Sequence, residues 1–156
     1  MKYTVEVEIN QPRDRVAELF DSQDNLGAWQ PGFVSCEHLE GDVGKPGAKS
    51  KLTYKNKGRD VAMVETILDI KMPEVFKAKF EAPGMVMTVE NIFEEIDAKT
   101  TRIISNNEAE VSSFMMRMMA LLMPGCFKKE STKFLLNFKA FAEDGTDLRD
   151  QSSPGT

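Results

Sequence analysis

The chain has 156 residues, a formal net charge of −5, two cysteines and one histidine. This length is typical of a single domain that buries enough surface to fold without disulfides or a metal. The acidic balance argues against a general nucleic-acid-binding protein, and two cysteines are too few for a disulfide framework.

The N-terminal sequence MKYTVEVEIN alternates apolar and polar residues and has no apolar run, so we expect no signal peptide. No segment reaches the roughly 20 apolar residues of a membrane span, so we expect no stable membrane insertion. Together with unpaired cysteines, these features indicate a cytoplasmic protein.

Alternation over residues 2–9 predicts a half-buried first strand. Pro12 suits the first turn of a helix, and a second short helix is expected over 22–29. Six strands follow, separated by turn residues: 33–40, 48–56, 60–71, 75–82, 85–96 and 101–111. Because connections this short join only antiparallel neighbours, we expect an antiparallel meander.

Two helices are expected after the last strand. Residues 112–123 are rich in methionine, and residues 127–143 form a strongly amphipathic helix beyond Pro124-Gly125. From Gly145 the chain has little apolar content. We therefore expect one domain over 1–144 and a disordered tail over 145–156. The apolar stripe of the last helix consists of Phe127, Phe134, Leu135, Phe138, Phe141 and Ala142.

This order of elements resembles the helix-grip fold of the START-like (SRPBCC) superfamily, above all its polyketide cyclase/dehydrase and lipid-transport branch. Local similarity lies in the glycine-rich turn from Glu37 to Ala48 and in the helix pair from Val16 to Trp29. The resemblance implies an α+β fold in which a seven-stranded antiparallel sheet wraps around the long C-terminal helix. It implies no single function, because the superfamily includes carriers, cyclases, hydrolases and chaperone cofactors.

Turn lengths assign the strand residues that face the last helix, because directly opposed residues share a face of the sheet. A two-residue turn at Lys57-Gly58 places Leu52 opposite Met63 and Ser50 opposite Glu65. The first hairpin therefore places Glu65 on the inner face.

The next hairpin supports the same assignment. A two-residue turn at Met72-Pro73 pairs Lys71 with Glu74 and places Glu65 opposite Phe80, whereas a three-residue turn would reverse the faces. The assignment leaves three apolar side chains on the outer face: Val64, Leu68 and Ile70.

An apolar pocket with a few polar groups is the usual anatomy of a small-molecule site. We therefore expect binding or transport of a small hydrophobic molecule, lipid-like or polyketide-like, without a cofactor. The residues predicted to line the pocket are Ser50, Leu52, Tyr54, Met63, Glu65, Ile67, Ala78, Phe80, Met87, Val89, Asn91, Phe93, Ser131, Phe134 and Phe138.

Glu65 is the candidate catalytic residue, because burial among apolar side chains raises a carboxyl pKa towards the range of a general acid or base. The alternative is a carboxylate that bonds Tyr54 or Ser50 and anchors a ligand or water. The first alternative function is thus a cyclase or dehydratase that uses Glu65 with Tyr54 or Asn91.

A second alternative function is a protein-interaction module that uses a sheet edge or the methionine-rich segment. That segment could be a lid, a helix packed on the sheet rim or a homodimer surface. We expect no metal site, because Cys36, His38 and Cys126 lack ligand spacing. Cys36 and His38 also lack a residue that would orient them as a nucleophile pair.

Overall fold

The computed structural model describes residues 1–123 and 125–151. Its elements follow the predicted order, and the predicted strands agree closely with the observed ones. The elements are β1 (Lys2–Ile9), α1 (Arg13–Asp21), η1 (Gln23–Asn25), α2 (Leu26–Trp29), β2 (Phe33–Glu40), β3 (Lys49–Asn56), β4 (Arg59–Lys71), β5 (Val75–Ala82), β6 (Met85–Asp97), β7 (Thr100–Val111), α3 (Phe114–Leu122), α4 (Cys126–Asp144) and α5 (Leu148–Gln151).

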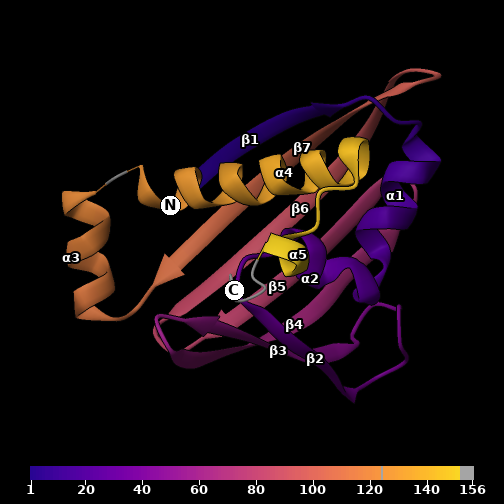
Figure 1. The fold of residues 1–156 in the computed structure, drawn as a ribbon. Helices are drawn as coiled ribbons and strands as arrows, with labels where there is room; N and C mark the ends of the chain where they lie inside the picture. Colours follow the sequence, from indigo (N-terminus) through magenta and orange to yellow (C-terminus); the bar gives the residue numbers. More distant parts are fainter. Residues whose placement is uncertain (124, 152–156) are drawn as a thin grey trace.

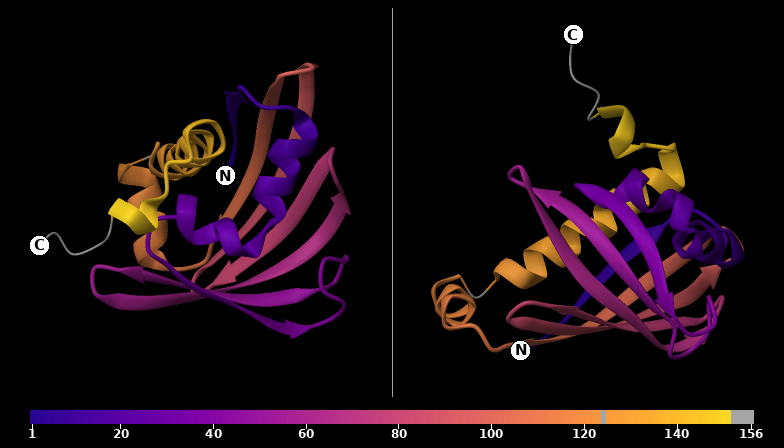
Figure 2. Two further views of the ribbon diagram at one scale, coloured as in Figure 1. Left: turned by 45° about the vertical axis from the view of Figure 1, so that its right-hand side comes forward. Right: turned by 90° about the horizontal axis from the view of Figure 1, so that it is seen from below.

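The strands form one antiparallel seven-stranded sheet in the order β1-β7-β6-β5-β4-β3-β2. Strands β2 to β7 make the predicted meander, and β1 joins its far edge by pairing with β7. The sheet curves strongly, and α1, α2 and α4 lie on its concave side (Figure 1, Figure 2). The α+β helix-grip architecture expected from the sequence is therefore confirmed.

Two of the predicted turns have the predicted length. The β3–β4 hairpin turns at Lys57-Gly58, where both residues have positive φ, and it sets Ser50 opposite Glu65. Positive φ at both central residues is the geometry that two-residue hairpins favour. The β5–β6 hairpin turns at Pro83-Gly84, which gives the pairs Ala82–Met85, Phe80–Met87 and Ala78–Val89.

The β4–β5 turn differs from the prediction. Lys71 lies opposite Val75 instead of Glu74, so the turn has three residues. The extra turn residue alone would move Glu65 to the outer face. A register shift between Ile67 and Asp69 adds one extra residue to β4, and this bulge restores the predicted faces for the residues before it. Glu65 therefore still faces Phe80 on the inner side. Beyond the bulge, Ile70 pairs with Phe76, which corrects its predicted outer position.

A tightly packed aromatic cluster fixes α4 against one end of the sheet. Phe138 and Phe93 are almost completely buried, and Phe20 packs within 5.3 Å of the ring centroids of both. Trp29 of α2 stacks on Phe20 and lies edge-on to Phe138. Both helices of the pair, α1 and α2, therefore supply an aromatic side chain to the core.

The tail differs from the prediction in its first part. Gly145 ends α4 in a left-handed conformation with φ of 70°, and residues Leu148–Gln151 form the short helix α5 beside α2. Arg149 donates a hydrogen bond to the backbone carbonyl of Asp24. Residues 152–156 of the predicted tail, like Pro124, lie outside the described residues.

Candidate functional site

The concave face of the sheet has two halves that differ in packing. In the packed half, side chains such as Phe93, Phe138 and Trp29 are buried with at most 5% exposure. In the open half, apolar side chains of the same face are only partly buried: Met63, Phe80, Met87, Val89 and, from α4, Phe134. Among the strands, α4 packs mainly on β1, and β3 to β5 curve away from it (Figure 2).

The pairing places the predicted strand residues on the concave face. Leu52, Ile67 and Ala78 are buried, as is Phe93 of the packed half. The role of the predicted residues in ligand binding stays a prediction. Strand pairing sets the predicted strand residues in these rows of directly opposed positions: Ser50–Glu65–Phe80–Met87, Leu52–Met63, Tyr54–Val61, Ile67–Ala78–Val89, Phe76–Asn91 and Phe93–Ile103.

Glu65 is the only carboxylate among the predicted lining residues, and the structure gives it an unusual environment. Burial, aided by the negative charge of Asp21, raises the pKa of Glu65 to about 7. No cation or hydrogen-bond donor of the described residues opposes that rise. The residue as a whole is only partly buried. Near neutral pH both protonation states of this carboxyl group are therefore populated.

Tyr54 does not bond Glu65, which corrects one of the sequence alternatives. Its hydroxyl donates to Oε1 of Gln30 over 2.6 Å. Burial and the nearby charge of Glu65 raise the pKa of Tyr54 above its usual value. The phenol therefore stays neutral and ties β3 to the residue that follows α2.

Three residues of this region were not predicted as site residues: Cys36 and Asp21, which interact electrostatically with Glu65, and Gln30, which bonds Tyr54. Burial and then Glu65 raise the pKa of the Cys36 thiol, and a hydrogen bond with Ser50 opposes that rise. The thiol is thus kept protonated, which does not suit a nucleophile. Cys36 lies opposite Leu52, so it faces the concave side. The sequence did not reveal this pairing, because a connection as long as residues 41–48 does not determine the register of β2 against β3.

The other polar groups of the concave face bind mainly to one another. Ser131 and the hydroxyl of Tyr3 are 2.7 Å apart, so Ser131 joins α4 to β1. On β7, Nδ2 of Asn107 donates to Ser105. Asn91 is 7% exposed and has no hydrogen-bond partner among the described side chains. Asn91 and Glu65 are therefore the two predicted polar residues that make no hydrogen bond with a described side chain.

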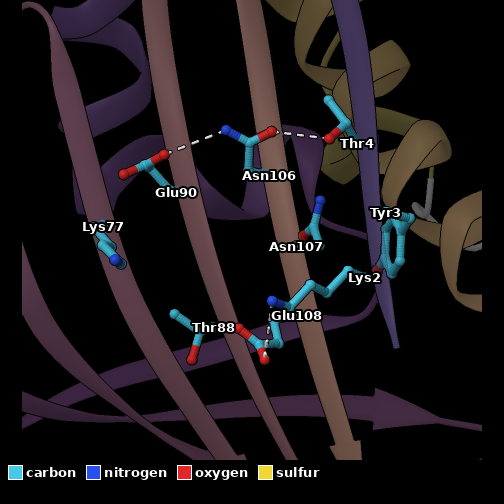
Figure 3. Close-up of a pocket in the computed structure, with 9 residues that line it drawn as sticks. All are labelled: Lys2, Tyr3, Thr4, Lys77, Thr88, Glu90, Asn106, Asn107 and Glu108. Atoms are coloured by element: carbon cyan, nitrogen blue, oxygen red, sulfur yellow. Dashed lines mark hydrogen bonds and ion pairs between the residues drawn. The ribbon is translucent and has the colours of Figure 1, made fainter.

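A different depression lies on the outer face of the sheet. It has a volume of about 290 Å³ and is lined mostly by polar side chains of β1, β5, β6 and β7. Asn106 at its centre accepts a hydrogen bond from Thr4 and donates one to Glu90 (Figure 3). None of the predicted lining residues contributes to it. This outer depression is therefore separate from the predicted hydrophobic site.

Within residues 1–123 and 125–151, no cluster of His, Cys, Asp or Glu side chains is arranged to hold a metal ion. In the same part of the chain, no helix has the length and apolar character needed to cross a membrane.

Structural comparison finds the same fold in many solved proteins. The aromatase/cyclase ZhuI from Streptomyces sp. R1128 has a TM-score of 0.73 at 16% identity, with 100% of this chain and 99% of that chain covered. A conserved protein from Geobacillus kaustophilus has a TM-score of 0.74 at 16% identity, covering 91% and 95%. Ara h 8.0201 has a TM-score of 0.68 at 14% identity, covering 91% and 97%. Identities this low show a shared fold and nothing more.

No curated protein matches the sequence. The family model described as "Polyketide cyclase / dehydrase and lipid transport" matches residues 1–143, which include every strand and almost all of α4. The chain therefore belongs to the polyketide cyclase/dehydrase and lipid-transport family of the START-like superfamily.

Proposed function

We propose that the protein binds a small hydrophobic molecule in the open half of the concave face. The observation that carries this proposal is the partial exposure of Met63, Phe80 and Met87, although all three face the concave side. Apolar side chains that face inward yet keep contact with solvent gain free energy when an apolar ligand covers them. Membership of a family described by lipid transport supports the same function.

The polar groups constrain the ligand's chemistry. Glu65 and Asn91 lie on the same face, and Met87 and Val89 precede Asn91 on alternate positions of β6. A protonated Glu65 donates a hydrogen bond, and an amide both donates and accepts. The ligand is therefore expected to be mostly apolar with one or two oxygen atoms, such as a hydroxyl or a carbonyl.

A cyclase or dehydratase reaction is the second candidate, and the environment of Glu65 favours it. A group with a pKa of about 7 and no ion partner has the properties of a general acid or base at neutral pH. Ionised Glu65 would accept a proton from a carbon next to a carbonyl, and protonated Glu65 would donate one to a departing hydroxyl. Tyr54 is a supporting residue here, because its hydroxyl already donates its hydrogen bond to Gln30.

Binding is tested by mass spectrometry of small molecules that co-purify with the native protein, followed by thermal unfolding with increasing doses of those molecules. A true ligand raises the melting temperature with dose. Met87→Trp fills the open half and should abolish the increase. Leu68→Trp, on the outer face of β4, is the matched control and should retain it. Equal responses of both variants would contradict the proposed location.

Catalysis is tested by incubating the wild type with a panel of aromatic polyketides. The enzymatic function predicts turnover that Glu65→Gln abolishes while dose-dependent thermal stabilisation persists. Binding without turnover by the wild type would leave the carrier function and reject the cyclase function.

A further inference from the structure

Helix α3 exposes an unusually large apolar surface. Phe114, Met115, Leu121 and Leu122 are each between 75% and 78% exposed, and Met123 just beyond the helix is 56% exposed. The helix projects from the body of the protein beyond the end of β7 (Figure 1, Figure 2). A contiguous exposed apolar patch of this kind marks an interaction surface.

The exposed side chains share one face of α3. At 100° per residue, Leu121, Phe114, Met118, Leu122, Met115 and Met119 cover an arc of about 160°. The remaining residues turn towards the protein: Met116 and Ala120 are partly buried, and Arg117 donates through Nε to the carbonyl of Val111. The helix thus presents its apolar side outward, opposite to the arrangement of a helix packed on its own core.

The charge around α3 is opposite in sign to that of the whole chain. Residues 111–133 contain four basic residues and one acidic residue, whereas the chain carries a net charge of −5. Lys128, Lys129 and Lys133 are exposed and line one surface depression on the first turns of α4, together with Glu130. An exposed apolar helix beside exposed lysines is the pattern of a segment that lies in the interface of an anionic membrane.

We infer that α3 and the lysine-bearing turns of α4 dock the protein onto an anionic phospholipid bilayer. The nine residues of α3 span only about 13.5 Å, so the helix lies along the interface and does not cross the bilayer. Its apolar face enters the boundary of the acyl chains, and the lysines bind lipid phosphates.

A second copy of the chain fits this surface less well. A twofold contact through α3 would bring the basic residues of both copies towards one another, and like charges that face each other weaken a contact. A bilayer surface covers the whole apolar arc and complements the positive charge.

The position of α3 connects this surface with the open half. The backbone amides of Ser112 and Ser113, just before α3, both donate to the carbonyl of Gly84 in the β5–β6 turn. Phe80 and Met87 lie a few residues from that turn on the inner face. Docking through α3 would therefore place the open half next to the lipid. The docking itself depends only on the surface of α3 and α4, and it stands independently of ligand binding.

Flotation with lipid vesicles tests the inference. The wild type should bind vesicles that contain phosphatidylglycerol, should bind phosphatidylcholine vesicles much more weakly, and should dissociate as salt increases. Leu121→Ser combined with Leu122→Ser should weaken binding more than tenfold. Replacing Lys128, Lys129 and Lys133 with Gln should weaken vesicle binding by about fivefold for each lysine removed.

Matched controls use exposed residues far along the chain from α3. Leu39→Ser with Val43→Ser removes two exposed apolar side chains, and Gln at Lys51, Lys55 and Lys57 removes three exposed lysines. Both controls should bind vesicles like the wild type, and circular dichroism should show that all variants fold. Three results would overturn the inference: no vesicle binding by the wild type, equal loss in variants and controls, or a wild-type dimer that Leu121→Ser with Leu122→Ser converts to a monomer.

Discussion

The two halves of the concave face belong to one sheet, and α4 contributes side chains to both, yet only one of them is tightly packed. In the packed half, Phe20 and Trp29 of the helix pair fill the space between Phe93 of the sheet and Phe138 of α4. In the open half, the corresponding inward side chains include Met63, Phe80 and Met87, and these stay partly exposed. We therefore expect the packed half to provide most of the stability and the open half to bind the ligand.

Replacing one phenylalanine in each half gives the largest expected difference. Phe138→Ala creates a cavity in a fully buried cluster and should lower the free energy of unfolding by about 3–5 kcal/mol. Phe80→Ala in the open half should cost only about 1–2 kcal/mol, because its ring already keeps part of its surface in solvent. Urea denaturation of both variants measures the two values. Equal losses would mean that the open half is as tightly packed as the other.

The protonation of Glu65 should produce the next largest effect. Its pKa in the folded protein is about 7, above its ordinary value of 4.5, so the folded state binds the proton more tightly than the unfolded state. The stabilising effect is fully present below pH 4.5 and is lost as pH rises through about 7. The loss should amount to about 3 kcal/mol at most.

Unfolding measured between pH 5 and about pH 8 tests this sign. Glu65→Gln should remove most of the slope and should be more stable than the wild type at the upper end. Glu110→Gln, on an exposed outer position of β7, serves as the control and should keep the wild-type slope. A wild-type stability that increases over this range would show that Glu65 gains a partner in the folded state.

The inner position of Glu65 was predictable, but part of the reasoning that led to it was wrong. The turn at Lys57-Gly58 alone places Glu65 inward, because positive φ at both residues suits a two-residue hairpin. At Met72 the turn has three residues instead of two, and the bulge before Asp69 compensates for the extra one. A bulge depends on the local twist and packing of the sheet, and the alternation of side chains alone does not reveal it.

Elements of the site that depend on long connections could not be predicted. The contact of Tyr54 with Gln30 and the approach of Asp21 to Glu65 depend on how the helix pair docks on the sheet. Periodicity predicted those helices but not their docking, which tertiary packing decides. Likewise, one apolar residue, Leu148, and one cation, Arg149, were too weak a signal to predict that α5 would fold against α2.

Deleting residues 146–156 should have a moderate effect. The deletion removes partly buried Leu148 and the hydrogen bond from Arg149 to Asp24, and both support the helix pair that closes the packed half. We expect a loss of about 1 kcal/mol. Thermal or urea unfolding of the shortened chain measures it, with Asp150→Asn as a control at an exposed position of α5. An unchanged stability would show that α5 does not support α2.

The smallest expected effect on stability concerns α3. Leu122 is 75% exposed, so Leu122→Ser should change the free energy of unfolding by less than about 0.5 kcal/mol. Leu135→Ala in α4 is the contrasting variant, since Leu135 is 5% exposed and its truncation should cost about 2–5 kcal/mol.

Hydrogen exchange should show that α3 is less stable than the sheet without any mutation. Amides of α3 should exchange well before those of β5, because α3 has few buried contacts and β5 pairs on both edges. Protection of α3 equal to that of β5 would mean that α3 is held rigidly on the sheet rim, and its exposed apolar face would then be preformed before it meets any partner.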